Sequence, residues 1–224
     1  YKTRRNKRTE NMIIRHRINT VGQLKDVPHN HGVELDLRGY GDKLFMSHDP
    51  LTDEGIKSNA YTDFEEYLRH WNHAIMVLNV KEMGYEKKII ELMHKYKVKD
   101  WFFQDEEFPY VYRATRKENM RKVSIRFSEA EPIEYVQAQI DEQGQPMLDW
   151  VWVDTNTKMP ITSEAIPTLK KFKTCLVCPE RWGRPADIQN YIEQLKKLDF
   201  KLDAVMTAKD YVGVWEKSGV VNLD

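Results

Sequence analysis

The chain has 224 residues, of which 41% are apolar, enough for one large domain or two small ones with a substantial core. Its 35 basic and 35 acidic side chains give a formal net charge of +0, which excludes a global field that would recruit nucleic acid or an acidic membrane. The sequence has no apolar run of about 18 residues, so we expect no transmembrane segment.

Residues 1–10 are rich in Lys and Arg and show no periodicity. We predict that they form a poorly ordered basic lead-in to a single domain over 11–224. Basic residues in this lead-in do not interleave with aromatic ones, which argues against a nucleic-acid-binding arm. The sequence contains no secretory signal pattern, so we expect a cytoplasmic location.

Eight short apolar runs follow, each rich in Val, Ile, Phe or Trp. The predicted strands lie at residues 12–17, 32–38, 74–80, 100–105, 122–127, 149–155, 174–179 and 204–208. Most are almost continuously hydrophobic, which is typical of strands covered on both faces. Between them, apolar residues spaced three and four apart predict helices at 61–71, 85–96, 107–119, 131–142, 163–172 and 185–198.

Alternating strands and helices predict parallel βαβ units, and eight of them favour a single-domain α/β fold, the (β/α)8 TIM barrel. A doubly wound sheet would need a glycine-rich phosphate loop after its first strand, and Arg15-His16-Arg17-Ile18-Asn19 is not one. After the second strand, Gly39-Tyr40-Gly41-Asp42 is a turn signal, followed by a short extended piece. We predict a short hairpin insertion there, which returns His48 towards the end of the strand.

The two cysteines, Cys175 and Cys178, are three residues apart in a predicted strand and should face opposite ways. No second ligand pair accompanies them. We therefore expect buried thiols rather than a zinc site or a disulfide.

In barrels of this kind the functional site lies at the carboxyl ends of the strands. Polar residues gather at that end of each predicted strand. In strand order they are His16 and Arg17; Glu34, Asp36 and Arg38; Asn79 and Lys81; Gln104 and Asp105; Arg126 and Ser128; Asp154; Glu180; and Thr207 and Lys209. Strand ends also meet solvent. The polar residues of the later strands are therefore equally consistent with a functional site and with the solvent-exposed rim of the barrel.

Glu34 and Asp36 are two residues apart in the second strand, so they point to the same face. Two buried carboxylates repel each other, and they normally share a cation, share a proton or pair with basic groups. His16, Arg17 and His48 lie on either side in the sequence. The set predicts acid-base chemistry on an anionic substrate, with a divalent metal.

The series His16-Arg17, Asn19-Thr20, Glu34-Leu35-Asp36, His48-Asp49 and Lys81 resembles the motif set of the glycerophosphodiester phosphodiesterases. That family belongs with the phosphatidylinositol-specific phospholipase C-like phosphodiesterases. The resemblance covers essentially the whole chain, from about 11 to 214, and it implies a TIM barrel with phosphoric diester hydrolase activity.

The resemblance also implies roles for individual residues. His16 and His48 match two catalytic histidines, one taking a proton from the attacking hydroxyl and the other donating one to the leaving oxygen. Glu34 and Asp36 match acids that hold Mg²⁺ or Ca²⁺. Arg17 and Lys81 would bind the substrate phosphate and stabilise the charge that develops on it. For these two cations, a salt bridge to Glu34 or Asp36 is the structural alternative.

The sequence departs from the family pattern at two places, just before Lys81 and just after His16-Arg17. Asn79 stands where the family has an acid; an amide oxygen can still ligate the cation, but one negative charge is lost, which should weaken metal affinity. Ile18 stands where glycine usually follows His-Arg, narrowing the mouth beside His16. Asp105, Asp154 and Glu180 are alternative sources of the missing carboxylate.

The function expected from this resemblance is metal-assisted cleavage of a glycerophosphodiester or a related sugar or lipid phosphodiester, through a cyclic phosphate where the substrate's own hydroxyl attacks. Two alternatives remain open: a metal-independent phosphodiester lyase, and a catalytically silent barrel that binds a phosphorylated ligand. The expected partner is a small-molecule phosphodiester, with no nucleic acid. Trp101, Trp152 and Trp182 are candidates either to flank a sugar or glycerol group or to pack the barrel.

Overall fold

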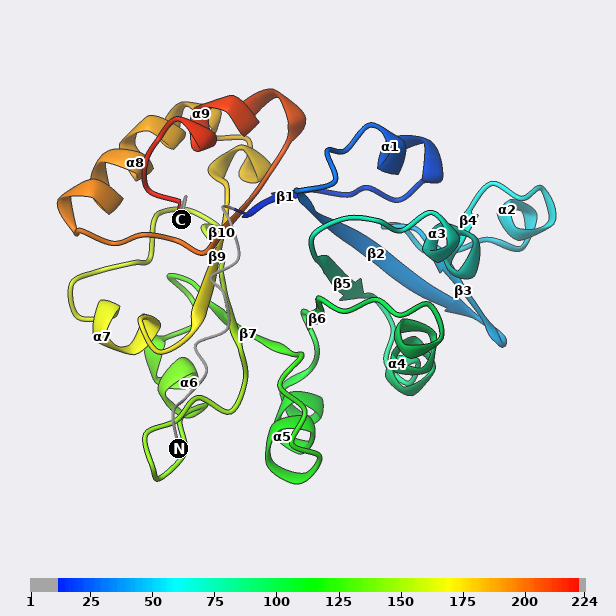
Figure 1. Ribbon diagram of the computed structural model, residues 1–224, viewed down its shortest axis with the longest axis horizontal. Coiled ribbons are helices and arrows are strands. Elements are labelled where there is room, and N and C mark those ends of the chain that lie inside the picture. The colour runs from blue at the N-terminus through cyan, green and yellow to red at the C-terminus, as the bar shows by residue number, and fades with distance from the viewer. Residues whose placement is uncertain (1–11, 222–224) are drawn as a thin grey trace.

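The computed structural model describes residues 12–221, so the basic lead-in predicted at 1–10 lies outside the described part of the chain. Its central element is a curled sheet of parallel strands, shown in Figure 1. These strands are β1 (Met12–Arg15), β2 (Gly32–Tyr40), β5 (Met76–Val80), β6 (Trp101–Gln104), β7 (Ser124–Phe127), β8 (Trp150–Val153), β9 (Lys173–Val177) and β10 (Ala204–Thr207). Each overlaps a strand predicted from an apolar run.

The parallel ladders run in the order β6, β5, β2, β1, β10, β9, β8 and β7. The two ends of this series meet at a narrow seam, where a single bridge joins Phe103 of β6 to Val123 beside β7. A side-chain hydroxyl, Oγ of Ser124, donates to the carbonyl of Phe103 at 3.0 Å. Beyond it Asp105 takes a left-handed φ of 60°, a conformation that Asp tolerates, and the ladder ends.

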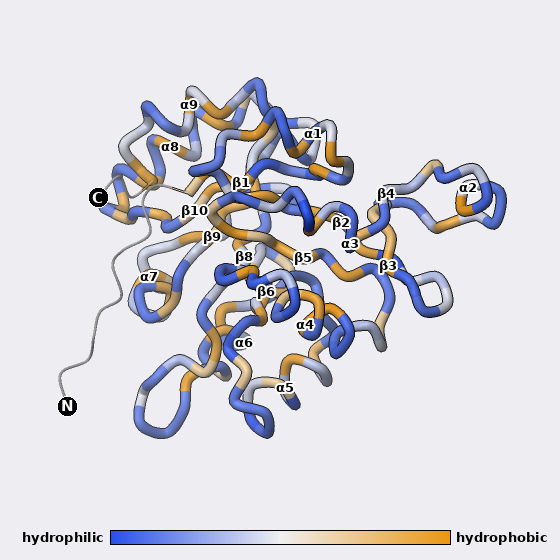
Figure 2. Tube along the Cα trace, turned by 45° about the vertical axis from the view of Figure 1, so that its right-hand side comes forward, coloured by the Kyte–Doolittle hydropathy of each residue, from blue (hydrophilic) through white to orange (hydrophobic). Residues whose placement is uncertain are grey.

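Two hydrophobic clusters lie on the two faces of the curled sheet. Inside, residues such as Ile14, Val77, Phe102 and Trp152 pack together. The outer face packs against the surrounding helices in a larger cluster. Figure 2 shows the same division, with hydrophobic segments concentrated in the central strands and hydrophilic ones in the outer turns. Gly32 allows the strands to pack closely inside, since a Cβ there would meet the Ile75 side chain at 2.5 Å.

The α-helices within residues 12–221 are α1 (Val21–Lys25), α2 (Asp53–Lys57), α3 (Phe64–Arg69), α4 (Glu86–Lys95), α5 (Phe108–Lys117), α6 (Ile133–Gln137), α7 (Ile166–Leu169), α8 (Ile188–Lys197) and α9 (Val212–Glu216). Three 3-10 turns, η1 (Pro179–Trp182), η2 (Pro185–Asp187) and η3 (Lys209–Tyr211), lie after β9 and β10. The mixed α/β fold predicted from the alternating pattern is confirmed. Helices α6 and α7 are shorter than their patterns predicted.

The chain after β2 forms an antiparallel pair with β3 (Lys43–Met46), in which Tyr40 faces Lys43 across the turn. Gly41 supplies the positive φ of 55° that this tight turn needs. A short third strand, β4 (Thr62–Asp63), pairs with β3. The pair brings the chain back along β2, so that Ser47 lies beside Asp36 in the middle of that strand, and His48 and Asp49 follow it.

The two cysteines are free and buried, as expected. Cys175 belongs to the inner cluster and Cys178 to the outer one, so they lie on opposite sides of the sheet. Trp101 packs in the outer cluster, whereas Trp152 lies in the inner one.

Candidate active site

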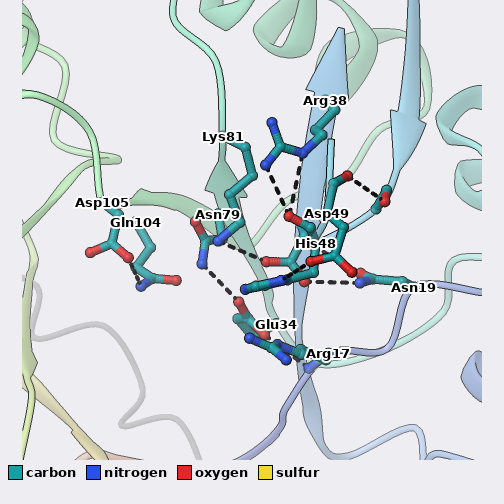
Figure 3. A network of polar contacts seen from close by, with 12 residues as sticks. Arg17, Asn19, Glu34, Arg38, His48, Asp49, Asn79, Lys81, Gln104 and Asp105 are labelled. Carbon is teal, nitrogen blue, oxygen red and sulfur yellow. Dashed lines mark hydrogen bonds and ion pairs between the residues drawn. The ribbon is translucent and has the colours of Figure 1, made fainter. Parts of the chain in front are cut away.

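Glu34 and Asp36 point into the mouth of the curled sheet, at the carboxyl end of β2, and both are almost fully buried, with 2% and 0% exposure. In register with them on β5 are Val77 and Asn79. Figure 3 shows Glu34 between Arg17 and Asn79, with Gln104 and Asp105 across the mouth. The predicted carboxylate pair therefore lies at the centre of a polar cluster.

Glu34 accepts two hydrogen bonds from neighbouring elements. The backbone N–H of Arg17 donates to Oε2 at 2.9 Å, and Nδ2 of Asn79 donates to Oε1 at 3.1 Å. Burial, followed by the negative charge of Asp36, raises the pKa of Glu34 to about 7 despite these donors. At neutral pH this carboxyl group therefore holds a proton part of the time.

Asp36 is held in its charged form by Asn19 and Lys81. Asn19 clamps it at two points: its Nδ2 donates to Oδ2 at 2.9 Å, and its Oδ1 accepts from the Asp36 backbone N–H at 2.9 Å. Nζ of Lys81 lies 2.9 Å from Oδ1 in an ion pair. Burial alone would raise the pKa of Asp36, but the Asn19 hydrogen bond and the Lys81 charge outweigh it, and the pKa is lowered. The two acids thus differ: Asp36 is held as a carboxylate, whereas Glu34 is easily protonated.

His16 follows β1, and its Nε2 lies 3.9 Å from Oε2 of Glu34. Burial, then the positive charges of Arg181 and Arg17, lower the pKa of His16 to about 3. This imidazole is therefore neutral at physiological pH and can accept a proton. Arg17 takes a left-handed φ of 53°, a strained conformation that aims its backbone N–H at Glu34.

His48 is positioned by the strand pair that returns along β2. The guanidinium of Arg38 donates to the His48 carbonyl through Nε at 3.3 Å and Nη2 at 3.0 Å (Figure 3). It also pairs with Glu82 at 2.8 Å. Nδ1 of His48 lies 2.9 Å from Oδ1 of Asp49. Because a carboxylate only accepts, Nδ1 carries the hydrogen and Nε2 is left for a ligand. The His48 side chain is 39% exposed and so is open to solvent.

These contacts bring the predicted residues together at one mouth. His16, Arg17, Glu34, Asp36, Asn79 and Lys81 are joined by the contacts given above. His48 adjoins them, since the Ser47 N–H donates to the Asp36 carbonyl at 3.1 Å. Their roles in catalysis or binding stay predictions.

The predicted metal ligands do not fit a metal ion in this arrangement. All four carboxylate oxygens of Glu34 and Asp36 already face a donor or a cation of the protein. Asn79 turns its nitrogen, not its oxygen, towards Glu34, as expected beside a carboxylate. Within residues 12–221 no group of three or more His, Cys, Asp or Glu side chains is placed to hold a metal ion. The Mg²⁺ or Ca²⁺ ion stays a prediction.

Further residues line the same mouth: the sequence did not single out Arg181, and it offered Asp154 only as a strand-end residue and an alternative acid. Arg181, in η1, lies over the Trp182 ring at 5.6 Å and makes no ion pair with the described carboxylates. Asp154, after β8, is 3% exposed and accepts a hydrogen bond from Nε1 of Trp182 at 2.9 Å. Asn19 stood in the resembling motif but was assigned no role. The sequence feature that could have pointed to Asn19 is the capping residue next to it. Thr20 caps α1 and so fixes the loop after β1, in which Asn19 lies.

Three cavities lie next to one another across the mouth. The histidine pocket, about 240 Å³, is lined by His16, Arg17, Glu180, Arg181, Met206, Thr207 and Ala208. The central cavity, about 50 Å³, is lined by Glu34, Asn79, Gln104, Asp105, Arg126, Trp152, Asp154, Arg181, Trp182 and Met206. The seam pocket, about 620 Å³, is lined by Asp105, Glu106, Phe108, Ser124, Ile125, Arg126, Glu131, Tyr135 and Trp152. Neighbouring cavities share lining residues, so they lie side by side, with the central cavity between the other two.

No family model matches the sequence, and no curated protein does. Solved structures match in fold. The glycerophosphodiester phosphodiesterase of Agrobacterium tumefaciens has a TM-score of 0.60 at 13% identity, over 89% of this chain and 98% of that one. The glycerophosphodiester phosphodiesterase of Thermotoga maritima has a TM-score of 0.54 at 16% identity, over 83% of this chain and 85% of that one. This chain shares the glycerophosphodiester phosphodiesterase fold.

The glycerophosphodiester phosphodiesterase fold agrees with the resemblance predicted from the His-Arg, Glu-x-Asp and His-Asp motifs. It spans nearly the whole chain, as the motif spacing predicted. No helix within residues 12–221 has the length and apolarity needed to cross a bilayer. The cytoplasmic location stays a prediction.

Proposed function

We propose that the chain is a phosphodiesterase that acts on a glycerophosphodiester or a related sugar or lipid phosphodiester at the mouth of the curled sheet. The observation that carries this proposal is the grouping of two histidines, the partly buried His16 and the more exposed His48, with the cations Arg17, Arg181 and Lys81 at one mouth. Two imidazoles of unlike surroundings can supply a base and an acid for one displacement at phosphorus. The shared glycerophosphodiester phosphodiesterase fold supports the same assignment.

His16 acts as the general base in this proposal. Its low pKa keeps it neutral, so it can take the proton of the attacking hydroxyl or water. Glu34, 3.9 Å away, stabilises the imidazolium that forms when the proton arrives. His48 acts as the general acid in its imidazolium form: Asp49 accepts from Nδ1–H, and Nε2–H gives its proton to the leaving oxygen, which departs as an alcohol.

The phosphate group binds between Arg17 and Arg181, which both line the histidine pocket. A guanidinium binds phosphate oxygens in a bidentate manner, and neither arginine is paired with a carboxylate among the described residues. Lys81 lies further in and is paired with Asp36, so it stabilises charge that develops on the phosphoryl oxygens while it holds Asp36 in place. We assign no step to a metal ion, since the ligands do not fit one.

A second candidate is a barrel that binds a phosphorylated ligand without turnover. It is favoured by Asn79, whose amide donates to Glu34 where the family pattern has an acid that would hold a cation.

The metal-independent lyase predicted from the sequence shares the first half of the reaction. A hydroxyl of the substrate attacks the phosphorus, the other arm leaves as an alcohol, and a cyclic phosphate is the product. Phosphorus NMR distinguishes this product from the phosphomonoester of a hydrolase.

The test is the hydrolysis of a phosphodiester by His16→Ala and His48→Ala. We expect each variant to lose roughly 100-fold or more in kcat, the usual effect of a removed general acid or base. His70→Ala is a matched control, because the His70 side chain is also 39% exposed and also contacts a carboxylate, that of Glu66 at 3.1 Å. The control should keep full activity. Full activity in both His16→Ala and His48→Ala would refute the assignment, and tight phosphodiester binding without turnover by the unmodified chain would establish the second candidate.

A further inference from the structure

The seam pocket is lined by residues that follow β6 and by residues of β7, α5 and α6, among others. Figure 1 shows where these four elements lie in the fold. Strands β6 and β7 share a single bridge, and past it the cavity passes between them from Trp152, inside the sheet, to Phe108 and Tyr135 outside. The pocket shares Asp105, Arg126 and Trp152 with the central cavity, which in turn shares Arg181 with the histidine pocket. The seam pocket therefore adjoins the central cavity, which adjoins the histidine pocket, so an arm of a molecule with its phosphate at His16 would cross the central cavity to reach the seam pocket.

The outer wall of the pocket is aromatic and exposed. Phe108 is 46% exposed and Tyr135 is 51% exposed, and their ring centroids are 6.2 Å apart at an interplanar angle of 37°. Exposed aromatic rings are costly to leave in water, so a pair of them on a pocket wall marks a surface that a flat apolar face of a ligand covers. They come from different helices and converge on the same opening.

Two hydrogen-bond acceptors without described donors lie at the inner end of the pocket: Gln104 lines the adjoining central cavity, and Glu106 lines the seam pocket itself. Gln104 is 4% exposed and gives its Nε2–H to Oδ2 of Asp105 at 2.6 Å. Since a carboxylate only accepts, this contact fixes the amide, and its Oε1 lies buried without a hydrogen-bond partner among the described residues. Oε1 of Glu106 is likewise buried without a described partner. An unsatisfied buried acceptor favours a ligand that brings O–H donors.

The charges exclude a second phosphate here. Asp105, Glu106 and Glu131 line the pocket, and its cation, Arg126, is paired with Asp105 and lies 3.5 Å from Asp154 and 3.8 Å from Glu131. Arg17 and Arg181, which make no ion pair with the described carboxylates, line the histidine pocket on the other side of the central cavity. The phosphate and the seam pocket's ligand therefore occupy different cavities.

We propose that the seam pocket binds a sugar ring, carried on one arm of the phosphodiester whose phosphate lies in the histidine pocket. A pyranose has a flat face of C–H groups that packs on Phe108 and Tyr135 and hydroxyl groups that donate to Gln104 and the carboxylates. An acyl chain does not fit the three carboxylates, and a quaternary ammonium group has no hydrogen to donate to Gln104. This inference rests on the proposed phosphodiesterase function and adds the substrate class.

The experiment compares three p-nitrophenyl phosphodiesters that share a leaving group and differ in the other arm, which is methyl, choline or the 6-position of glucose. We expect the unmodified chain to have its highest kcat/KM with the glucose arm. Phe108→Ala and Tyr135→Ala should each lower kcat/KM for that substrate by roughly fivefold to tenfold, as expected for one lost stacking contact, and leave the methyl ester unaffected. Tyr112→Ala is the control, because Tyr112 is 47% exposed on the same helix as Phe108 but does not line the pocket.

Equal rates for the three arms, a preference for choline, or equal losses on all three substrates would overturn the sugar assignment while leaving the phosphodiesterase proposal intact. A readout that needs no turnover is saturation-transfer NMR with methyl glucoside 6-phosphate. We expect transfer to the sugar-ring protons in the unmodified chain and in Tyr112→Ala, and its loss in Phe108→Ala. No transfer to the ring in the unmodified chain would refute the sugar subsite, whatever the activity assays show.

Discussion

Replacing Asn79 by Asp tests whether the mouth can hold a divalent cation. Asn79 is 5% exposed, and its Nδ2 donates to Oε1 of Glu34 at 3.1 Å. The substitution removes this donor and places a second carboxylate against Glu34, whose pKa burial and Asp36 already raise to about 7. The variant therefore has the acid that the family pattern places at position 79, but this acid faces the carboxylate of Glu34.

The expected loss of stability follows from these contacts. A hydrogen bond to a charged acceptor contributes about 1.5–3 kcal/mol, and two ionised carboxylates at this separation would repel by about 5 kcal/mol at an effective dielectric constant of 20. Proton uptake by the pair relieves most of the repulsion, so we expect Asn79→Asp to lower the free energy of unfolding by roughly 2–4 kcal/mol at pH 8. The loss should be smaller at pH 5, where the pair shares a proton.

The assay is urea unfolding followed by tryptophan fluorescence, with and without millimolar Mg²⁺ or Ca²⁺. A binding cation present at 100 times its Kd would raise the free energy of unfolding of Asn79→Asp by about 2.7 kcal/mol. We expect no such gain in the unmodified chain or in Asn79→Ala, which removes the same donor without adding a ligand. An equal metal-dependent gain in the unmodified chain would refute the reasoning and show that Glu34 and Asp36 exchange their protein donors for a metal.

Three further predictions concern residues around the mouth. Lys81→Met should lower the free energy of unfolding by about 2–3 kcal/mol, because it leaves the buried Asp36 carboxylate without its cation; adding Asp36→Asn should recover part of this loss in urea unfolding. Arg38→Ala should lower kcat by roughly tenfold or more at an almost unchanged unfolding midpoint, because Arg38 holds the His48 carbonyl; a variant with normal kcat would exclude this positioning role. Burial, then the charges of Glu86 and Asp105, raise the pKa of Glu106 to about 8, so the folded state binds this proton more tightly than the unfolded state. Glu106 should therefore contribute a fall in the free energy of unfolding between about pH 5 and pH 8, on the order of 2 kcal/mol after allowance for partial exposure, and Glu106→Gln should remove this part of the slope while leaving the part due to Glu34.

The strands could be predicted from the sequence because a strand buried on both faces is apolar throughout. Residues 150–153 and 204–207 satisfy that condition and form β8 and β10. Short helices gave no such signal: α2 has no buried residue and α1 buries Leu24 alone, so neither carries an apolar stripe. Their starts depend on capping by Thr52 and Thr20, which also occurs in ordinary turns.

One side of the site could be predicted because its residues occur as short motifs in β1, β2 and β5. The other side could not, since polarity at a strand end does not say where a side chain points. Ser128 was a candidate, yet its hydroxyl accepts from Ala130 and Glu131 and so only closes a loop. Arg181 belongs to a 3-10 turn that no periodic pattern marks. The orientation of Asn79 depends on Glu34, 45 residues away in the sequence, and only the folded register brings the two together.

The measurement that tests the phosphodiesterase proposal most directly is phosphorus NMR of a glycerophosphodiester incubated with the unmodified chain and with a His16→Ala/His48→Ala double variant. We predict that the diester resonance disappears with the unmodified chain and is replaced by that of a phosphomonoester or a cyclic phosphate. The double variant should leave the diester intact while keeping a cooperative unfolding transition. Conversion of the diester at the same rate by the double variant would contradict the assignment of the chemistry to this pair of histidines.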